Sequence, residues 1–272
     1  MRGTKFLPVS REEMIERGWY YYDFLVVTAD AYVDHPSFGA AVIGRLLEAE
    51  GLRVCIVPQP SWHGDYRDFK RLGRPRLWFG IAPGCMDSMV NKYTAARRLR
   101  SEDAYSPDGR HDMRPEYPTI VYTRILKELY PDVPVVLGGI EASLRRLTHY
   151  DYWKDEVIES VLVSSGADIL TYGMGENIIR KIAALLDKGV PINKIRDVRG
   201  TVWLGEKGDK IHFDSCGEWD FAKLKTDKEY YARAFAVQYE NQDSVYGKAL
   251  VEYYGDKMLV QNPPMPPLEQ AE

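Results

Sequence analysis

Short apolar runs separated by polar, helix-forming segments recur along the first two thirds of the chain. Five runs are rich in β-branched residues, as expected for strands buried on both faces. They cover residues 23–29, 53–58, 77–82, 133–137 and 168–172. Helices are expected over residues 37–50, 86–100, 119–130, 139–146, 151–166 and 176–188. This alternation predicts an α/β protein with a doubly wound, mostly parallel five-stranded sheet in the flavodoxin-like order 2-1-3-4-5.

The pattern changes after residue 198. Residues 201–205 and 210–213 predict a small antiparallel hairpin, and residues 228–243 predict a helix whose aromatic side chains would pack in the core. An extended strand is expected at 257–262, and four prolines within 263–267 exclude a helix and favour polyproline II. We therefore expect three parts: an α/β domain over 1–198, a small α+β extension over 199–262, and a proline-rich linker over 263–272.

A Gly-Gly pair marks the centre of the predicted fold. Gly138 and Gly139 join a buried strand to a helix with an acidic residue, Glu141, in its first turn. In a parallel sheet such turns lie at the carboxyl edge, where glycine lets a ligand approach the backbone. We expect the loops 28–39, 83–86 and 138–142 to meet there. A similar glycine turn follows the fifth strand, at Gly173, Gly175 and Glu176.

Acidic and imidazole side chains gather on the first of these loops. Asp30, Asp34 and His35 fall within six residues and could share a site with Glu141. Carboxylates with an imidazole could bind a metal or act as acid and base, but they also cap loops by hydrogen bonding to turn amides. Both interpretations stay open. A basic and aromatic group near Arg145 and Arg146 could hold a phosphate or form an interdomain surface.

Composition narrows the function classes. The 272 residues are 45% hydrophobic with a net charge of -4, which argues against non-specific nucleic-acid binding. Cys55, Cys85 and Cys216 lie far apart in the sequence. Their spacing therefore predicts no disulfide framework, zinc site or iron-sulfur motif. No signal peptide and no apolar run long enough for a membrane span is evident, so we expect a cytoplasmic protein without membrane partners.

Several long motifs are recognisable. They are DAYVDHPSFG at 30–39, MDSMVNKYTA at 86–95, GGIEASLRRLTHYDYW at 138–153, IRDVRGT at 195–201 and VQNPPMPPL at 260–268. Together they closely resemble the N-terminal segment of YgiQ-type radical S-adenosylmethionine (SAM) proteins. In that family the segment precedes a barrel whose C-x-x-x-C-x-x-C motif binds a [4Fe-4S] cluster. This chain lacks that motif, so the resemblance implies an accessory domain, similar to cobalamin-binding domains, for a barrel supplied in cis or in trans.

Cobalamin is therefore one possible cofactor. Cobalamin domains of this kind present D-x-H-x-x-G after the first strand, whereas here Asp34 adjoins His35 and Gly39 follows four residues later. The chain departs from that spacing, which puts His35 in doubt as a cobalt ligand. Two other hypotheses stay open: a stand-alone small-molecule enzyme using Asp30, Asp34, His35 and Glu141, and an interaction module that recruits a separate barrel chain.

Overall fold

The computed structural model describes residues 6–32 and 39–268 and contains two compact units. The first unit comprises Met1–Glu141 with Ser165–Ala167, and the second comprises Ala142–Ser164 with Asp168–Glu272. Elements up to residue 137 are α1 (Arg11–Glu16), β1 (Phe24–Thr28), α2 (Gly39–Ala49), β2 (Val54–Pro58), α3 (Arg67–Lys70), β3 (Trp78–Ala82), α4 (Ser88–Lys92), η1 (Pro107–Gly109), α5 (Pro118–Leu129) and β4 (Val135–Leu137).

The elements that follow β4 include the short helices α6 (Gly139–Leu144) and α7 (Val161–Ser165), whose residues are divided between the units. The others are β5 (His149–Asp151), β6 (Glu156–Ile158), β7 (Ile169–Thr171), α8 (Glu176–Asp187), η2 (Ile192–Lys194), β8 (Thr201–Glu206), β9 (Ser215–Asp220), α9 (Phe221–Thr226), α10 (Lys228–Glu240), β10 (Ala249–Tyr254) and β11 (Lys257–Gln261). No helix within residues 6–32 and 39–268 is long and apolar enough to cross a bilayer.

The first unit is built on a parallel sheet in the order β2-β1-β3-β4. Phe24 of β1 lies opposite Val54 of β2 and Trp78 of β3, and every residue of β1 is buried. The α/β class and the expected order of the first four strands are thus confirmed. The fifth predicted strand forms as β7 and belongs to the second unit.

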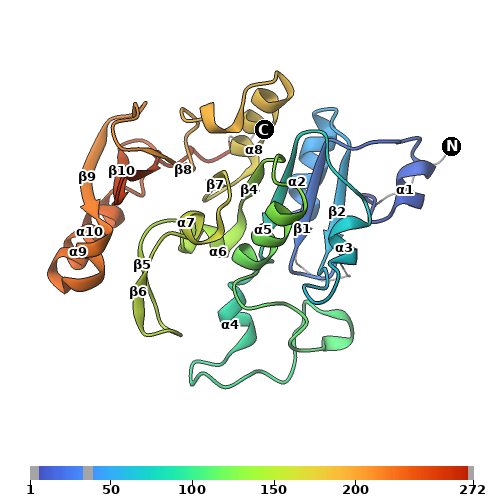
Figure 1. The fold of residues 1–272 in the computed structure, drawn as a ribbon, viewed down its shortest axis with the longest axis horizontal. Helices are drawn as coiled ribbons and strands as arrows, with labels where there is room; N and C mark the ends of the chain where they lie inside the picture. The colour runs from blue at the N-terminus through green and yellow to red at the C-terminus, as the bar shows by residue number, and fades with distance from the viewer. Residues whose placement is uncertain (1–5, 33–38, 269–272) are drawn as a thin grey trace. The chain divides into compact units, whose positions relative to one another are not determined.

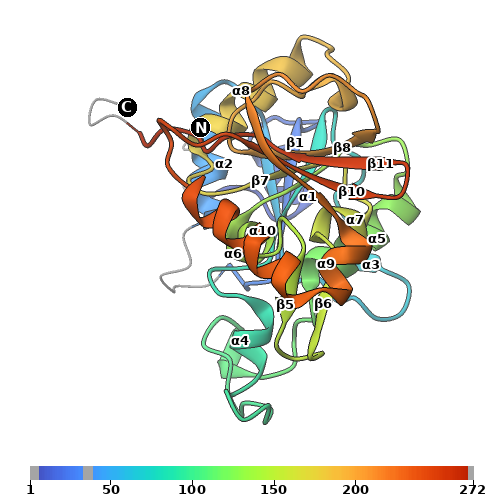
Figure 2. The ribbon, with the colours of Figure 1, turned by 90° about the vertical axis from the view of Figure 1, so that its left-hand side faces the viewer.

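Helices cover both faces of this parallel sheet. The connection through α2 joins β1 to β2, and the connection through α5 joins β3 to β4 in the opposite direction across the sheet. Because such crossovers are right-handed, α2 and α5 pack on opposite faces, as Figure 2 shows on either side of β1. Ser10 followed by Glu13 has the sequence spacing of a capping box. In the structure the Glu13 amide donates to Ser10 Oγ at the start of α1, and Glu13 Oε2 accepts from the Val9 amide.

The second unit contains a mixed sheet in the order β7-β8-β11-β10-β9. Strand β8 is antiparallel to both β7 and β11, β10 is antiparallel to β11, and β9 runs parallel to β10. Helix α9 contacts β9 and β10, and α10 contacts β9 and α9 (Figure 1). The strand expected at 257–262 is confirmed as β11.

The helix predicted over 86–100 is wrong except at Ser88–Lys92. Helix α4 ends at Lys92, and the following residues fold back so that Tyr93 pairs with Leu99. The Thr94 hydroxyl accepts a hydrogen bond from the Arg98 amide at 3.1 Å. A short polar side chain that bonds nearby backbone competes with helix formation, and here it closes a turn.

The hairpin predicted from 201–205 and 210–213 is also wrong. A tight turn does form, because the Asp209 amide donates to the Glu206 carbonyl, but 210–213 is not a strand. Strand β8 pairs instead with β11, about fifty residues later, and with β7. Both edges of β8 are therefore already filled.

The helix predicted over 151–166 is replaced by two elements. Strands β5 and β6 form an antiparallel hairpin, and only Val161–Ser165 is helical. The turn is set by Asp151, whose Oδ1 accepts from the amides of Trp153 and Lys154. An aspartate that caps successive amides favours a turn over a helix interior.

Candidate functional site

The loops that follow β1, β3 and β4 come together at the carboxyl edge of the first unit's sheet, as predicted. Asp30 follows β1, and its Oδ2 accepts a hydrogen bond of 2.8 Å from the Cys85 amide of the β3 loop. Gly139 follows β4 with φ of +82°, and a Cβ at that position would lie 3.0 Å from Cδ of Pro83. We call this meeting point the rim.

A buried arginine braces the rim from beneath. Arg114 Nη1 donates to Asp30 Oδ1 at 2.9 Å, and Arg114 Nε donates to Asp103 Oδ2 at 3.0 Å. The relative exposures of Arg114 and Asp30 are only 1% and 4%. A Cβ at Gly84 would lie 2.2 Å from Asp30 Oδ1, so only glycine lets the β3 loop approach this carboxylate. Asp30 therefore organises the loops rather than facing solvent.

The long segment between α4 and α5 supplies Asp103, the second carboxylate that Arg114 binds. Burial alone would raise the pKa of Asp103, but the Arg114 charge and hydrogen bonds from Tyr105 and Ser106 hold that pKa below its usual value. The Ala31 amide donates to the Tyr105 carbonyl, which attaches the segment to the residues after β1. Neither Arg114 nor Asp103 is among the site residues predicted from the sequence.

Glu141 forms a second buried brace. Its Oε2 accepts from the Ser88 amide at 3.2 Å and from the Ser88 hydroxyl, and its Oε1 accepts from the Thr119 amide at 3.2 Å and from the Thr119 hydroxyl. The side chain has no solvent exposure. Burial raises the pKa of Glu141, and the four hydrogen bonds oppose that rise. The carboxylate thus ties the starts of α4, α5 and α6 together.

The rim also contains exposed residues. Cys85, Gly139 and Ile140 are exposed, and Gly84 is half-buried. The Gly138 amide donates to the Ile81 carbonyl, which extends the pairing of β3 and β4 into the turn. The rim therefore presents glycine-rich loops to solvent while its carboxylates are held below.

The remaining predicted site residues lie elsewhere. Asp34 and His35 lie outside the described residues. Gly173, Gly175 and Glu176 belong to the second unit, where the Gly173 amide donates to Ser143 Oγ at 3.3 Å and Gly175 is the residue before α8. Their contribution to a site shared with the rim stays a prediction.

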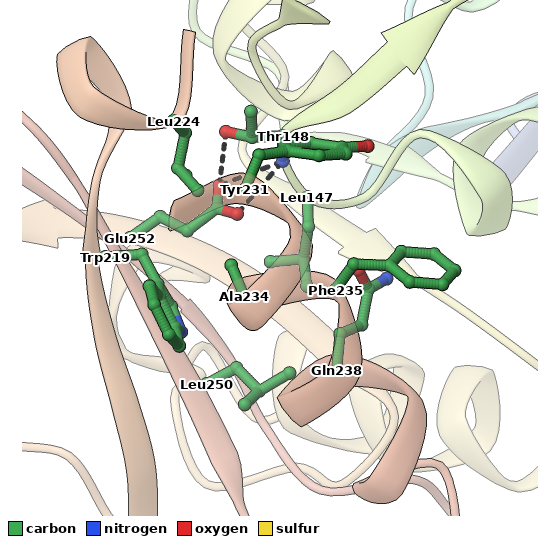
Figure 3. Close-up of a pocket in the computed structure, with 10 residues that line it drawn as sticks. All are labelled: Leu147, Thr148, Trp219, Leu224, Tyr231, Ala234, Phe235, Gln238, Leu250 and Glu252. Atoms are coloured by element: carbon green, nitrogen blue, oxygen red, sulfur yellow. Dashed lines mark hydrogen bonds between the residues drawn. The ribbon is translucent and has the colours of Figure 1, made fainter. Parts of the chain in front are cut away.

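The second unit holds a buried carboxylate that sequence reasoning missed. Glu252 accepts two hydrogen bonds from the Thr148 amide, one of 2.9 Å from the Thr148 hydroxyl and one of 2.7 Å from the Tyr254 hydroxyl. Burial raises the pKa of Glu252 despite these bonds. It lines the pocket of Figure 3, whose cavity volume of about 10 Å³ holds at most one water. This pocket is packing around a polar network rather than a ligand site.

The described residues do not fit an iron-sulfur cluster. Across residues 6–32 and 39–268, no three His, Cys, Asp or Glu side chains gather as a metal-binding group. Cys55 is buried in β2, Cys85 is exposed in the rim, and Cys216 lies in β9 of the second unit. A [4Fe-4S] cluster needs several thiolates at one point, and no such group occurs among the residues that the structure describes.

Comparison with known proteins gives close relatives that are longer than this chain. The chain is 54% identical over 277 residues to a UPF0313 protein of Porphyromonas gingivalis and 51% identical over 288 residues to one of Bacteroides thetaiotaomicron. These matches cover 99% and 100% of this chain but only 43% and 46% of the relatives. The chain thus spans less than half the length of the curated relatives it matches.

Solved structures offer only a distant similarity. Two structures of the radical SAM methyltransferase TsrM from Kitasatospora setae match with TM-scores of 0.44 and 0.42 and sequence identities of 17% and 16%. The first has cobalamin and a [4Fe-4S] cluster bound, and the second a tryptophan substrate and a SAM analogue. The matches cover 67% and 66% of this chain and 27% and 28% of TsrM.

The family comparison agrees with the motifs identified in the sequence. The model described as "Radical SAM N-terminal" matches residues 6–272, which is nearly the whole chain. The chain belongs to the radical SAM N-terminal family.

Proposed function

We propose that this chain is the N-terminal accessory part of a radical SAM protein. Its role is to bind a ligand or substrate at the rim and to dock a barrel that carries the [4Fe-4S] cluster and SAM. The family description and the greater length of the relatives support this role. The chemistry itself belongs to the barrel, because the described residues of this chain cannot hold the cluster.

The observation that carries the binding role is that the rim combines buried, hydrogen-bonded residues below with exposed residues above. Below, Arg114 and Glu141 fix three loops through buried hydrogen bonds. Above, Cys85 and Gly139 are exposed to solvent. Loops that are already fixed lose little entropy when a ligand binds, so a braced glycine edge is a suitable binding surface.

Cobalamin is the first ligand to test. When bound, it supplies a cobalt centre for group-transfer or radical chemistry. The turns at Gly84 and Gly139 are where this chain would receive the corrin. His35, whose spacing departs from that of the known cobalt-binding motif, lies outside the described residues. In this proposal the buried carboxylates of Asp30 and Glu141 position the loops, since both are committed to hydrogen bonds.

The experiment titrates the 272-residue chain with hydroxocobalamin and follows both the corrin absorbance and retention on gel filtration. Gly139→Ala should weaken binding, because its Cβ would press on Pro83 at the rim. Gly51→Ala is the matched control: Gly51 also has positive φ, of +89°, a Cβ there would meet no atom within 4 Å, and it precedes β2 at the opposite edge of the sheet. We expect about tenfold weaker binding for the first variant only, equivalent to about 1.4 kcal/mol.

An unchanged corrin spectrum with no retention would end the assignment of cobalamin. Equal weakening by both variants would instead indicate that general destabilisation, and not the rim, controls binding.

A further inference from the structure

Helix α10 is the most weakly buried long helix of the second unit. None of its thirteen residues, all of which are described, is buried. By contrast α8, in the same unit, buries five residues of its apolar face: Ile178, Ile179, Ile182, Ala183 and Leu186. Helices in proteins gain most of their stability from packing an apolar face against a partner. Helix α10 therefore lacks a partner on one side.

Large apolar side chains gather on that uncovered side. Phe235 and Tyr239, four residues apart on one face of the helix, are 55% and 70% exposed. Val245 and Tyr246, in the turn after the helix, are 73% and 83% exposed. We call these four residues the α10 patch. Figure 3 shows the Phe235 ring directed away from Trp219 and Leu250.

The first turn of α10 is fixed to the unit by polar contacts. The Tyr150 amide donates to the Tyr231 hydroxyl at 3.0 Å, and the Asp220 amide donates to the Tyr230 hydroxyl at 3.1 Å. Asp227 caps the helix by accepting from the amides of Glu229 and Tyr230. The helix is thus held in one orientation that presents the patch outward, which is typical of a preformed interaction surface.

The proline-rich end of the chain runs beside this patch. Arg199 Nη2 donates to the Ser244 carbonyl at 2.6 Å, and Arg199 Nε donates to the Pro264 carbonyl at 2.9 Å. A Cβ at Gly247 would lie 3.1 Å from Cδ of Pro264. One arginine therefore joins the turn that carries Tyr246 to the proline-rich segment that begins at Pro263.

We infer that the α10 patch is the docking surface for the part of the longer relatives that lies beyond this chain. The inference rests on the proposed function and adds to it the face and chemistry of the contact. A domain joined through residues 263–272 would be held close to the patch at high effective concentration, so a modest apolar contact suffices. Its complementary surface is apolar, with room for the rings of Phe235, Tyr239 and Tyr246.

The test compares the 272-residue chain with the same chain continued by the remainder of the Porphyromonas gingivalis relative. Hydroxyl-radical footprinting measures the oxidation rate of each aromatic residue. In the continued chain we expect Phe235, Tyr239 and Tyr246 to react about threefold or more slowly, because interface aromatics are desolvated. Tyr20, which is 89% exposed in the first unit, should react at the same rate in both proteins.

Substitutions then assign the protection to the patch. Tyr239→Glu combined with Tyr246→Glu should restore fast oxidation of Phe235 in the continued chain, whereas Tyr20→Glu should not. In the 272-residue chain both variants should keep the parent thermal midpoint, since exposed substitutions away from special contacts change stability little.

Two results would overturn the inference. One is unchanged oxidation of the patch in the continued chain, including the case in which protection appears on another face. The other is a dimer of the 272-residue chain that Tyr239→Glu disrupts, which would assign the patch to a second copy. Neither result tests the proposed ligand binding at the rim, because hydroxocobalamin binding is measured separately on the 272-residue chain.

Discussion

Glu141 shows how a residue predicted to face a ligand can instead hold the loops around it. The sequence placed it correctly in the first turn of the helix that the Gly-Gly pair begins, because the motif is local. Its neighbours Ser88 and Thr119 come from other loops, 53 and 22 residues away along the chain. The amide and hydroxyl of Ser88 both donate to Oε2 of Glu141, and those of Thr119 both donate to Oε1. That convergence turns a candidate acid into a brace.

We predict that Glu141→Gln destabilises the protein most at low pH. The folded-state pKa of Glu141 is raised above its ordinary value of 4.5, so its buried acid form is fully stabilising below that value, and stability is lost as pH rises through the raised pKa. Glutamine does not ionise, and its amide group would face the Ser88 donors. The loss in free energy of unfolding should be about 1–3 kcal/mol at pH 4.

Urea unfolding at pH 4, 6 and 8 measures this difference, which should shrink as pH rises. Glu128→Gln, at an exposed position of α5, is the control and should differ little from the parent protein at every pH. A difference that grows with pH would mean that the folded state favours the ionised carboxylate, contrary to the prediction.

At the scale of elements, the helices differ in how many of their side chains are buried. Helices α5 and α8 follow the predicted apolar periodicity, and each buries several side chains. Helix α10 was predicted for its aromatic content, and it forms, but the expected core packing is wrong because none of its residues is buried. Periodicity identifies that a segment is helical, whereas the neighbouring elements decide which side is covered.

Helix α10 should therefore depend on its N-cap more than a well-packed helix does. Asp227→Ala removes the acceptor for the amides of Glu229 and Tyr230, both bound at 3.0 Å, and should cost about 1 kcal/mol. Asp227→Asn keeps an acceptor and should be nearly neutral. Hydrogen exchange should become faster in residues 231–240 of the alanine variant only. Equal exchange in both variants would show that the cap contributes nothing to α10.

At the scale of the whole molecule, the chain forms two compact units, and the motifs identified in the sequence are distributed over both. The expected boundaries at 198/199 and 262/263 stay predictions, and the pattern of contacts instead separates the units near residue 141. The three cysteines are divided between the units, with Cys55 and Cys85 in the first and Cys216 in the second. Iron-sulfur chemistry consequently has no site among the described residues.

We predict that anaerobic reconstitution of the 272-residue chain with ferrous iron and sulfide yields no [4Fe-4S] cluster. Such a cluster requires thiolates gathered at one point, and the described part of the chain contains no such group. The measurement is the iron-sulfur charge-transfer absorbance and bound iron after desalting, with a ferredoxin reconstituted in parallel as the positive control. Stoichiometric cluster binding by this chain would contradict the assignment of the chemistry to another domain.

The sequence by itself determined the features that depend on near neighbours. Apolar β-branched runs specified β1 to β4, the Ser10 cap specified the start of α1, and the Gly-Gly pair specified the turn after β4. Each depends on residues within a few positions of one another, so its physical cause is present in the local sequence.

Only the tertiary structure decided the features that join distant residues. Arg114 reaches Asp30 across 84 positions, β8 pairs with β11 rather than with its own hairpin, and α10 keeps its aromatic side uncovered. No local pattern encodes these contacts, because the free energy of a buried ion pair or a strand pairing depends on which surfaces the completed fold brings together.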